Sequence, residues 1–289
     1  MLFGISLPPF GDFADISFLA ENAKVAETVG WDGIFIWDHV FFDPTFHPNA
    51  DPWCALAVVA DRTSKIRLGT MITPLARRRP WVLARQTVSV DHLSNGRLTL
   101  GVGLGDPVQW DFGFFHEPTD NKQRAQMLDE GLDILNGLWT GKPFSYSGQH
   151  YQINEVTFQP RPVQNPRIPI WVGGNWPNKP PMRRAARFDG FYPIKWDGGM
   201  TPQDWRESLT YIQQQRTVNT HFDLVHGGRI PDQHWHRAAP LIEPYSEVGV
   251  TWWIEDVSPW RFGASWEEPW RSEDTRHMVE LIKRGPPRL

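Results

Sequence analysis

In the stretch FIWDHV, residues 35–40, three apolar residues lead into Asp38 and His39. The side chains of this pair are suited to acid–base chemistry. An imidazole group titrates near neutrality, which suits proton transfer or hydrogen bonding to a polar ring. Alternatively, Asp38 only caps the preceding strand and His39 satisfies a loop carbonyl. The pair therefore predicts a chemical site if the strand opens toward a ligand, and a simple strand cap if it does not.

The segment GVGLGD, residues 101–106, could bring backbone close to a ligand. Alternate glycines, including Gly103 and Gly105, allow close approach to a flat ring or a phosphate, and Asp106 then projects into the same space. The same pattern also fits a tight turn in which Asp106 caps a short helix. Both interpretations stay open on the residues alone.

The segment GGNWP places Gly173, Gly174 and Asn175 ahead of a predicted helix. Free N–H groups at a helix start favour a phosphate, although the segment equally fits a plain turn. Trp176 in this segment could line a substrate pocket, but core packing explains it equally well.

Several cations could meet an anionic ligand. Lys195 could reach an anion, although a lone lysine is usually just solvated. The run Arg77-Arg78-Arg79 is typical of a solvated loop and becomes functional only if the ligand carries a long anionic tail.

Histidine and cysteine patterns argue against metal or nucleophile chemistry. Cys54 is the only cysteine, and no HxH motif follows the first predicted strand. His234 and His236 lie two apart in a predicted helical region, where their side chains point in different directions. No GxSxG motif is present. The sequence therefore predicts no metal site.

Composition excludes several classes of partner. The 289 residues carry a net charge of −4, which does not suggest a nucleic-acid-binding protein. No apolar run approaches the roughly 18 residues that a membrane span needs, and the start MLFGISLPPFG lacks the features of a signal peptide. We expect a soluble cytoplasmic protein that acts on a small molecule.

Strand and helix patterns alternate along the chain. Predicted strands are 3–7, 33–37, 66–72, 97–102, 169–174, 190–194, 222–228 and 249–255. Predicted helices are 15–30, 51–63, 80–96, 121–141, 182–188, 202–215, a His- and Trp-rich stretch after 228, and 274–284. Residues 142–169 interrupt the rhythm with Gly148 and five prolines, and predict an inserted hairpin and an irregular crossing.

Eight strand–helix units predict a parallel sheet that closes into a (β/α)8 TIM barrel, an α/β fold of one domain over residues 1–289. An open doubly wound sheet is the alternative. It would normally carry a glycine-rich turn after the first strand, where this chain has LPPFG. Ligands of such barrels bind at the carboxyl ends of the strands, where the residues described above are expected to lie.

Taken together, these strand ends resemble the luciferase-like monooxygenase superfamily of flavin- and deazaflavin-dependent barrel oxidoreductases. The resemblance covers residues 1–195 and is weaker beyond them. It is carried by three segments: AENAKVAETVGWDGIFIWDH, RLGTMITPLARRRPWVLARQTVSVDHLSNGRLTLGVGLG and PIWVGGNWPNKPPMRRAARFDGFYP. The order of an LGT strand, an RxP helix start, a D-x-LS-x-GR helix end and a GVGxG strand is its most specific part.

The resemblance implies coenzyme F-420, an 8-hydroxy-5-deazaflavin, as cofactor. It places Asp38 and His39 near the redox ring and gives Asp106 a part in proton transfer, where the family has a glutamate. It also implies a non-prolyl cis peptide at Met71-Ile72, ahead of Thr73, that backs the ring. Gly173-Gly174 would hold the cofactor phosphate.

One departure concerns the substrate. Sugar-phosphate dehydrogenases of this branch carry a tryptophan shortly after the Asp-His pair, whereas Phe41, Phe42 and Asp43 stand here. A sugar phosphate is therefore not implied, and the pocket is expected to come from residues 142–169 and the last two loops. Trp252-Trp253 could line this pocket, although core packing explains the pair equally well.

Our leading hypothesis is hydride transfer at a deazaflavin, with His39 and Asp106 handling the accompanying proton. An FMN-dependent monooxygenase on the same fold is the closest alternative, and a non-catalytic barrel that binds a partner is the alternative from another class. Relatives often pair, so a homodimer is expected by analogy.

Overall fold

The alternating pattern of the sequence becomes a ring of eight parallel strands in the computed structural model, which describes residues 1–42, 48–265 and 268–287. The strands lie in the order β1-β10-β9-β8-β7-β4-β3-β2, and β1 pairs with both β10 and β2, so the sheet closes. Their bounds are Leu2–Leu7 (β1), Gly33–Ile36 (β2), Arg67–Pro74 (β3), Leu98–Gly103 (β4), Ile170–Asn175 (β7), Gly190–Ile194 (β8), Asp223–Gly228 (β9) and Trp252–Asp256 (β10). The predicted (β/α)8 barrel is confirmed, and the open-sheet alternative is wrong.

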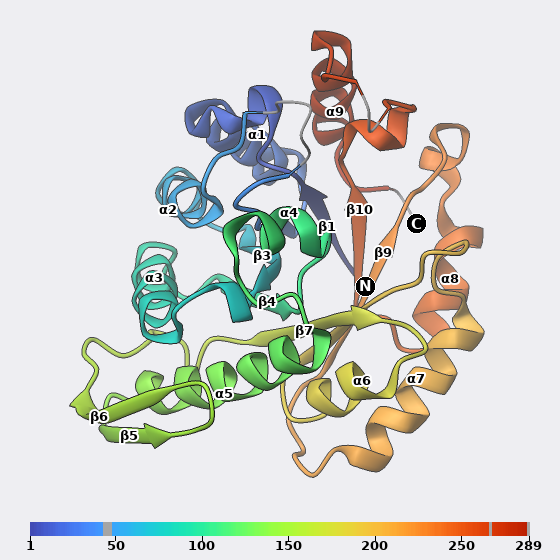
Figure 1. Ribbon diagram of the computed structural model, residues 1–289. Coiled ribbons are helices and arrows are strands. Elements are labelled where there is room, and N and C mark those ends of the chain that lie inside the picture. The colour runs from blue at the N-terminus through green and yellow to red at the C-terminus, as the bar shows by residue number, and fades with distance from the viewer. Residues whose placement is uncertain (43–47, 266–267, 288–289) are drawn as a thin grey trace.

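Helices from the connections form an outer ring around these strands (Figure 1). Their bounds are Ile16–Val29 (α1), Pro52–Arg62 (α2), Pro80–Leu93 (α3), Asn121–Trp139 (α5), Lys179–Ala185 (α6), Pro202–Gln215 (α7), Ala239–Glu247 (α8) and Ser272–Arg284 (α9). Local signals set several ends: the Asp15 side chain accepts hydrogen bonds from the first turn of α1, and Gly30 ends that helix with φ 99°. A short helix α4, Val108–Asp111, follows β4.

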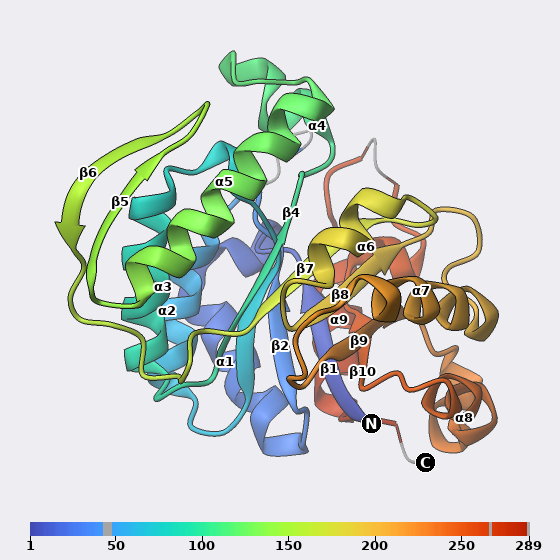
Figure 2. The ribbon, with the colours of Figure 1, turned by 90° about the horizontal axis from the view of Figure 1, so that it is seen from below.

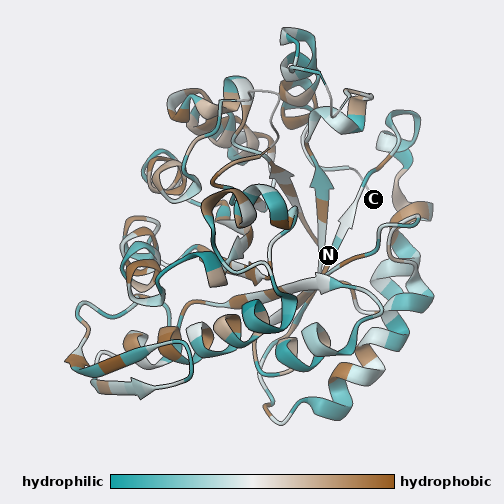
Figure 3. Ribbon diagram, in the orientation of Figure 1, coloured by the Kyte–Doolittle hydropathy of each residue, from teal (hydrophilic) through white to brown (hydrophobic). Residues whose placement is uncertain are grey.

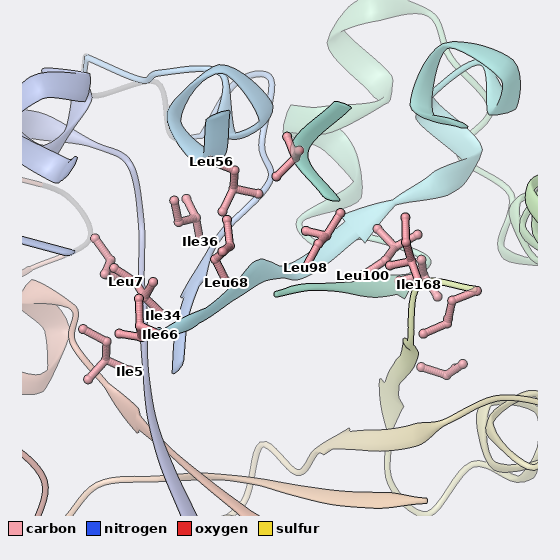
Figure 4. Close-up of a cluster of buried hydrophobic side chains, with 14 of the residues drawn as sticks. Ile5, Leu7, Ile34, Ile36, Leu56, Ile66, Leu68, Leu98, Leu100 and Ile168 are labelled. Atoms are coloured by element: carbon pink, nitrogen blue, oxygen red, sulfur yellow. The ribbon is translucent and has the colours of Figure 1, made fainter. Parts of the chain in front are cut away.

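Apolar side chains fill the space between the strands and the helices. Figure 4 shows members of this core from β1 to β4, with Ile36 and Leu68 close to Leu56 of α2. The faces of the helices that point away from the barrel carry hydrophilic residues, as α7 illustrates in Figure 3. This layer explains the helical periodicity seen in the sequence.

A second cluster of large side chains fills the inside of the barrel. The Phe35 and Trp171 rings lie 5.0 Å apart, and the Trp171 and Trp252 rings lie 5.4 Å apart. Gly190 makes room for this packing, because a Cβ there would lie 2.4 Å from the Trp171 ring. Trp252 is thus a core residue, and its neighbour Trp253 packs in the outer layer. The pocket-lining role expected of this pair is not supported.

The insertion between β4 and β7 contains the predicted hairpin, formed by antiparallel β5 (Pro143–Ser147) and β6 (Gln152–Thr157). The hairpin lies on the outer side of α5 (Figure 2). Glu130 of α5 accepts hydrogen bonds from the backbone at Gln149, His150 and Tyr151. The insertion therefore belongs to the outer layer, and the structure does not support the expectation that it builds the substrate pocket.

Candidate active site

The predicted site residues gather at one end of the barrel. His39 follows β2, Thr73 lies at the end of β3, Gly103 ends β4, Asn175 ends β7 and Lys195 follows β8. Because all eight strands run parallel, their carboxyl ends form a single rim. The sequence-based expectation that these residues share one rim is confirmed.

Asp38 is fully engaged by the loop after β3. Its side chain is 1% exposed. The carboxylate accepts from Thr73 Oγ1 at 2.8 Å, from Arg77 Nη2 at 2.6 Å, and from Arg78 Nη2 at 2.6 Å and Nε at 3.0 Å. Burial acts to raise the pKa of Asp38, but the two guanidinium groups hold it below its usual range. Asp38 therefore anchors this loop, and its expected place at the cofactor stays a prediction.

The arginine run is not the solvated loop that the sequence suggested. Arg77 and Arg78 are largely buried, with side chains 4% and 15% exposed, and both pair with Asp38. Arg77 also forms an ion pair with Asp111 of α4. Only Arg79 is exposed. Arg77 and Arg78 are therefore committed to internal carboxylates, because a buried cation without a partner costs several kcal/mol.

His39 makes a direct contact that sequence reasoning missed. Its Nδ1 lies 2.7 Å from Oδ2 of Asp111, and that aspartate is completely buried. The Phe10 and Phe42 rings flank the imidazole, with ring centroids 5.8 Å and 4.7 Å away. None of the described residues forms a hydrogen bond with Nε2 of His39. One ring nitrogen is thus committed, and the other remains open for a ligand.

Asp106 lies on the loop between β4 and α4. Its side chain is exposed and forms no hydrogen bond within the described part of the chain. A cis peptide joins it to Pro107, and α4 begins one residue later. Figure 2 shows α4 beyond the carboxyl end of β4. The contact between Asp111 and His39 therefore ties the loop that carries Asp106 to the loop that carries His39.

The peptide between Met71 and Ile72 is cis, as the resemblance implied. Ile72 is partly exposed and packs on the cluster inside the barrel. A Cβ on Gly103 would lie 2.1 Å from Ile72 Cδ1, and one on Gly173 would lie 3.0 Å from Ile72 Cγ2. These two glycines therefore make room for the Ile72 side chain, and their expected approach to a cofactor stays a prediction.

Two further glycines of the rim, Gly105 and Gly174, are explained by backbone conformation and close packing. Gly105 adopts φ +83°, and a Cβ there would lie within 3 Å of Pro74. A Cβ on Gly174 would lie 2.3 Å from Pro181 of α6. Gly105 thus has the positive φ that a tight turn requires, and Gly174 makes room for Pro181. Asn175 is exposed at the rim and stays available to a ligand.

Lys195 contacts both Trp176 and α7. The Lys195 ammonium lies 4.9 Å from the Trp176 ring and 2.7 Å from Oδ2 of Asp204. Asp204 also accepts from the Thr201 N–H in the capping box of α7. Burial acts to raise the pKa of Asp204, but Lys195 and Thr201 lower it. Lys195 thus pairs with a carboxylate at the start of α7, and its expected contact with a substrate stays a prediction.

Asp111 and Arg77 are the residues that sequence reasoning missed. Asp111 lies in the aromatic segment QWDFGFF, where a carboxylate is costly to bury without a partner. A carboxylate within an aromatic segment was thus the available signal in the sequence, and the arginine run offered it a partner of opposite charge. Asp43, which the family comparison singled out, lies outside the described residues.

The described residues contain no cluster of three or more His, Cys, Asp or Glu side chains arranged to hold a metal ion. None of their helices is long and apolar enough to cross a membrane.

The closed ring of eight parallel strands, with His39 on its carboxyl-end rim, defines the class of (β/α)8-barrel proteins. The family model described as luciferase-like monooxygenase matches residues 1–199, and the chain belongs to this family.

Relatives of known name support the same family. An F420-dependent glucose-6-phosphate dehydrogenase of Microbacterium testaceum is 33% identical over 198 residues, which are 66% of this chain and 55% of the relative. One from Nakamurella multipartita is 33% identical over 200 residues, 67% of this chain and 56% of the relative. The matched region thus spans about half the length of these relatives.

Solved structures share the fold at low sequence identity. An F420-dependent secondary alcohol dehydrogenase has a TM-score of 0.73 at 16% identity, covering 98% of this chain and 97% of that one. An F420-dependent tetrahydromethanopterin reductase of Methanopyrus kandleri has a TM-score of 0.72 at 19% identity, covering 99% and 98%. Monooxygenase RslO1 of Streptomyces bottropensis has a TM-score of 0.66 at 22% identity, covering 86% and 78%.

Proposed function

We propose that this protein is a coenzyme F-420-dependent oxidoreductase that transfers a hydride to or from a small organic substrate. The observation that carries the proposal is the state of His39, which has Nδ1 fixed by Asp111 and Nε2 open at the barrel rim. The names of the relatives, which match about two thirds of the chain, support F-420 over FMN.

The described residues fit the ring end of such a coenzyme. Ile72 presents a partly exposed apolar side chain beside the rim, suited to one face of a flat ring. Nε2 of His39 can hydrogen-bond a polar ring atom, and the exposed Asn175 can bind the anionic tail. Arg77, Arg78 and Lys195 already have carboxylate partners, so they are not assigned to the tail.

When bound, the coenzyme supplies hydride acceptance and donation. The chain handles the accompanying proton. Nε2 of His39 takes a proton from a substrate hydroxyl during oxidation and returns it during reduction, and Asp106 on the adjacent loop offers a second site for a proton. The aromatic rings beside His39 exclude water from this exchange.

A fluorescence titration tests this function. Purified protein is added to F-420, and in parallel FMN is titrated into the protein. We expect saturable quenching of F-420 fluorescence and no FMN binding at the same concentrations. His39→Gln should weaken F-420 binding by about tenfold, the equivalent of one hydrogen bond to the ring. His92→Gln, which changes a histidine on α3, is the matched control.

The opposite results select the alternatives. Tight FMN binding without a response to F-420 would identify an FMN-dependent monooxygenase, and binding of neither would identify a non-catalytic barrel. Both results would overturn the proposed function.

A further inference from the structure

The two carboxylate oxygens of Asp111 have separate partners. Oδ1 accepts from the Val40 N–H at 2.8 Å and from Arg77. Among the described residues, Oδ2 accepts only from His39, at 2.7 Å. The bonds to Oδ1 already join the loops after β2, β3 and β4, so loop anchoring does not require Oδ2. The contact with His39 is therefore a separate feature of the site.

The chemistry of this contact determines where His39 carries its proton. An ionised carboxylate can only accept hydrogen bonds, so Nδ1 of His39 must carry a hydrogen. A neutral imidazole has one N–H, which leaves Nε2 as an acceptor. The Arg77 guanidinium lies against Asp111 and balances the charge of its carboxylate in this buried position.

The rest of the imidazole is held as well. Phe10 and Phe42 lie beside the ring, and the Asn49 side chain donates to the His39 carbonyl at 3.0 Å. The His39 side chain is 11% exposed. A ring held in this way presents Nε2 in a fixed orientation.

We propose that Asp111 is a positioning residue that keeps neutral His39 in the tautomer with hydrogen on Nδ1. Nε2 is then the nitrogen that accepts a proton from the substrate or a hydrogen bond from the coenzyme ring. The use of Nε2 in catalysis rests on the proposed function, whereas the tautomer itself does not. Arg77 acts one step further away, through Asp111.

Nitrogen-15 NMR of the full chain with labelled histidine tests the tautomer directly. The His39 signals are assigned with His39→Gln. In the native protein above neutral pH we expect hydrogen on Nδ1 and a bare Nε2. Hydrogen on Nε2 in the native protein would overturn the proposal without any further variant.

Asp111→Asn provides the second arm. An amide can offer either oxygen or NH2 to Nδ1, so the constraint is lost and a mixture of tautomers, or the opposite one, is expected. Asp91→Asn is the matched control, because Asp91 is equally buried but bonds to Gln164 and the Val163 N–H on the outer layer. An unchanged His39 tautomer in Asp111→Asn would refute the role.

F-420 titrations of the same variants separate the two proposals. Asp111→Asn should bind F-420 about tenfold more weakly, and Asp91→Asn should bind it as the native protein does. Equal affinity of the native protein and Asp111→Asn would remove the link between Asp111 and the coenzyme. If the native protein does not bind F-420, the proposed function fails, while the NMR result still decides whether Asp111 sets the tautomer.

Discussion

Buried charge dominates the site at the scale of single residues. Asp38 and Asp111 are almost fully buried, and Arg77 bridges them while Arg78 adds a second bond to Asp38. Two carboxylates and two guanidinium groups cancel formally, so the group can be buried without net charge. Within this network, His39 is the side chain to which the proposed function assigns proton transfer.

Asp106 offers the clearest prediction at this scale. Asp106→Asn should lower turnover with F-420 by roughly 10²- to 10⁴-fold, because an amide cannot exchange a proton. Stability should change by less than about 0.5 kcal/mol, since the side chain is exposed and has no hydrogen bond within the described residues.

The measurement is F-420 reduction with a panel of small alcohols and glucose 6-phosphate, together with a thermal melt. The exposed Asp61→Asn, on α2, is the matched control. Turnover within twofold of the native rate would remove Asp106 from the chemistry.

At the scale of elements, single side chains join neighbouring strand–helix units. Glu27 of α1 accepts from three successive N–H groups just before β3, those of Ser64, Lys65 and Ile66, at 2.6–3.0 Å. Burial acts to raise the pKa of Glu27, but these bonds and Lys24 lower it to about 2. The Glu27 carboxylate therefore joins α1 to the segment between α2 and β3.

Glu27→Gln should lower the free energy of unfolding by about 1–3 kcal/mol at pH 7, because an amide oxygen is a weaker acceptor than a carboxylate. The folded pKa is depressed, so this contribution is present above the ordinary value of 4.5 and is lost as the pH falls toward 2.

Urea unfolding at pH 7 and pH 3 measures the difference. Glu21→Gln, an exposed change on the same helix, is the control. A difference between native and Glu27→Gln that is equal at both pH values would contradict this account.

At the scale of the whole molecule, barrel closure brings the last unit beside the first, since β10 pairs with β1. Glu255 at the end of β10 is completely buried and accepts from the Ile230 N–H at 2.8 Å, from Trp253 Nε1 at 2.8 Å and from Arg261. Burial raises the pKa of Glu255 to about 7, although these donors act to lower it.

The stability of the whole barrel should reflect this raised pKa. The folded state holds the Glu255 proton more tightly than the unfolded state does, so the contribution is complete below pH 4.5 and declines as the pH rises through 7. The decline is up to about 3 kcal/mol.

Comparison of the native protein with Glu255→Gln between pH 5 and pH 8 isolates this term, because the other groups titrate alike in both. The stability difference should shift in favour of the variant as the pH rises. Parallel pH profiles for the two proteins would show that Glu255 does not titrate in this range.

Much of the fold was predictable from the sequence because it depends on local patterns. The Asp51 cap and Pro52 start α2 as expected, and Gly30 ends α1. The barrel strands were recognisable because short apolar runs bounded by turn residues are typical of buried strands. Eight such units in order leave few ways to close the sheet, so architecture followed from periodicity.

The rim was predictable only in part. The sequence by itself determined that His39, Asp106 and Asn175 lie at or just beyond the carboxyl ends of barrel strands, since each closely follows a predicted strand end. It also implied the unusual peptide at Met71-Ile72 through the family resemblance.

The partners of the charged residues were decided by the tertiary structure alone. Asp38 meets Arg77 from 39 positions away, and His39 meets Asp111 from 72 positions away. Such contacts leave no periodic trace in the sequence, because they depend on how far each loop bends over the rim. The same holds for Gly103, whose missing side chain serves Ile72 of the neighbouring strand. Local patterns thus place residues on the rim, and only three-dimensional packing determines which of them remain open to a ligand.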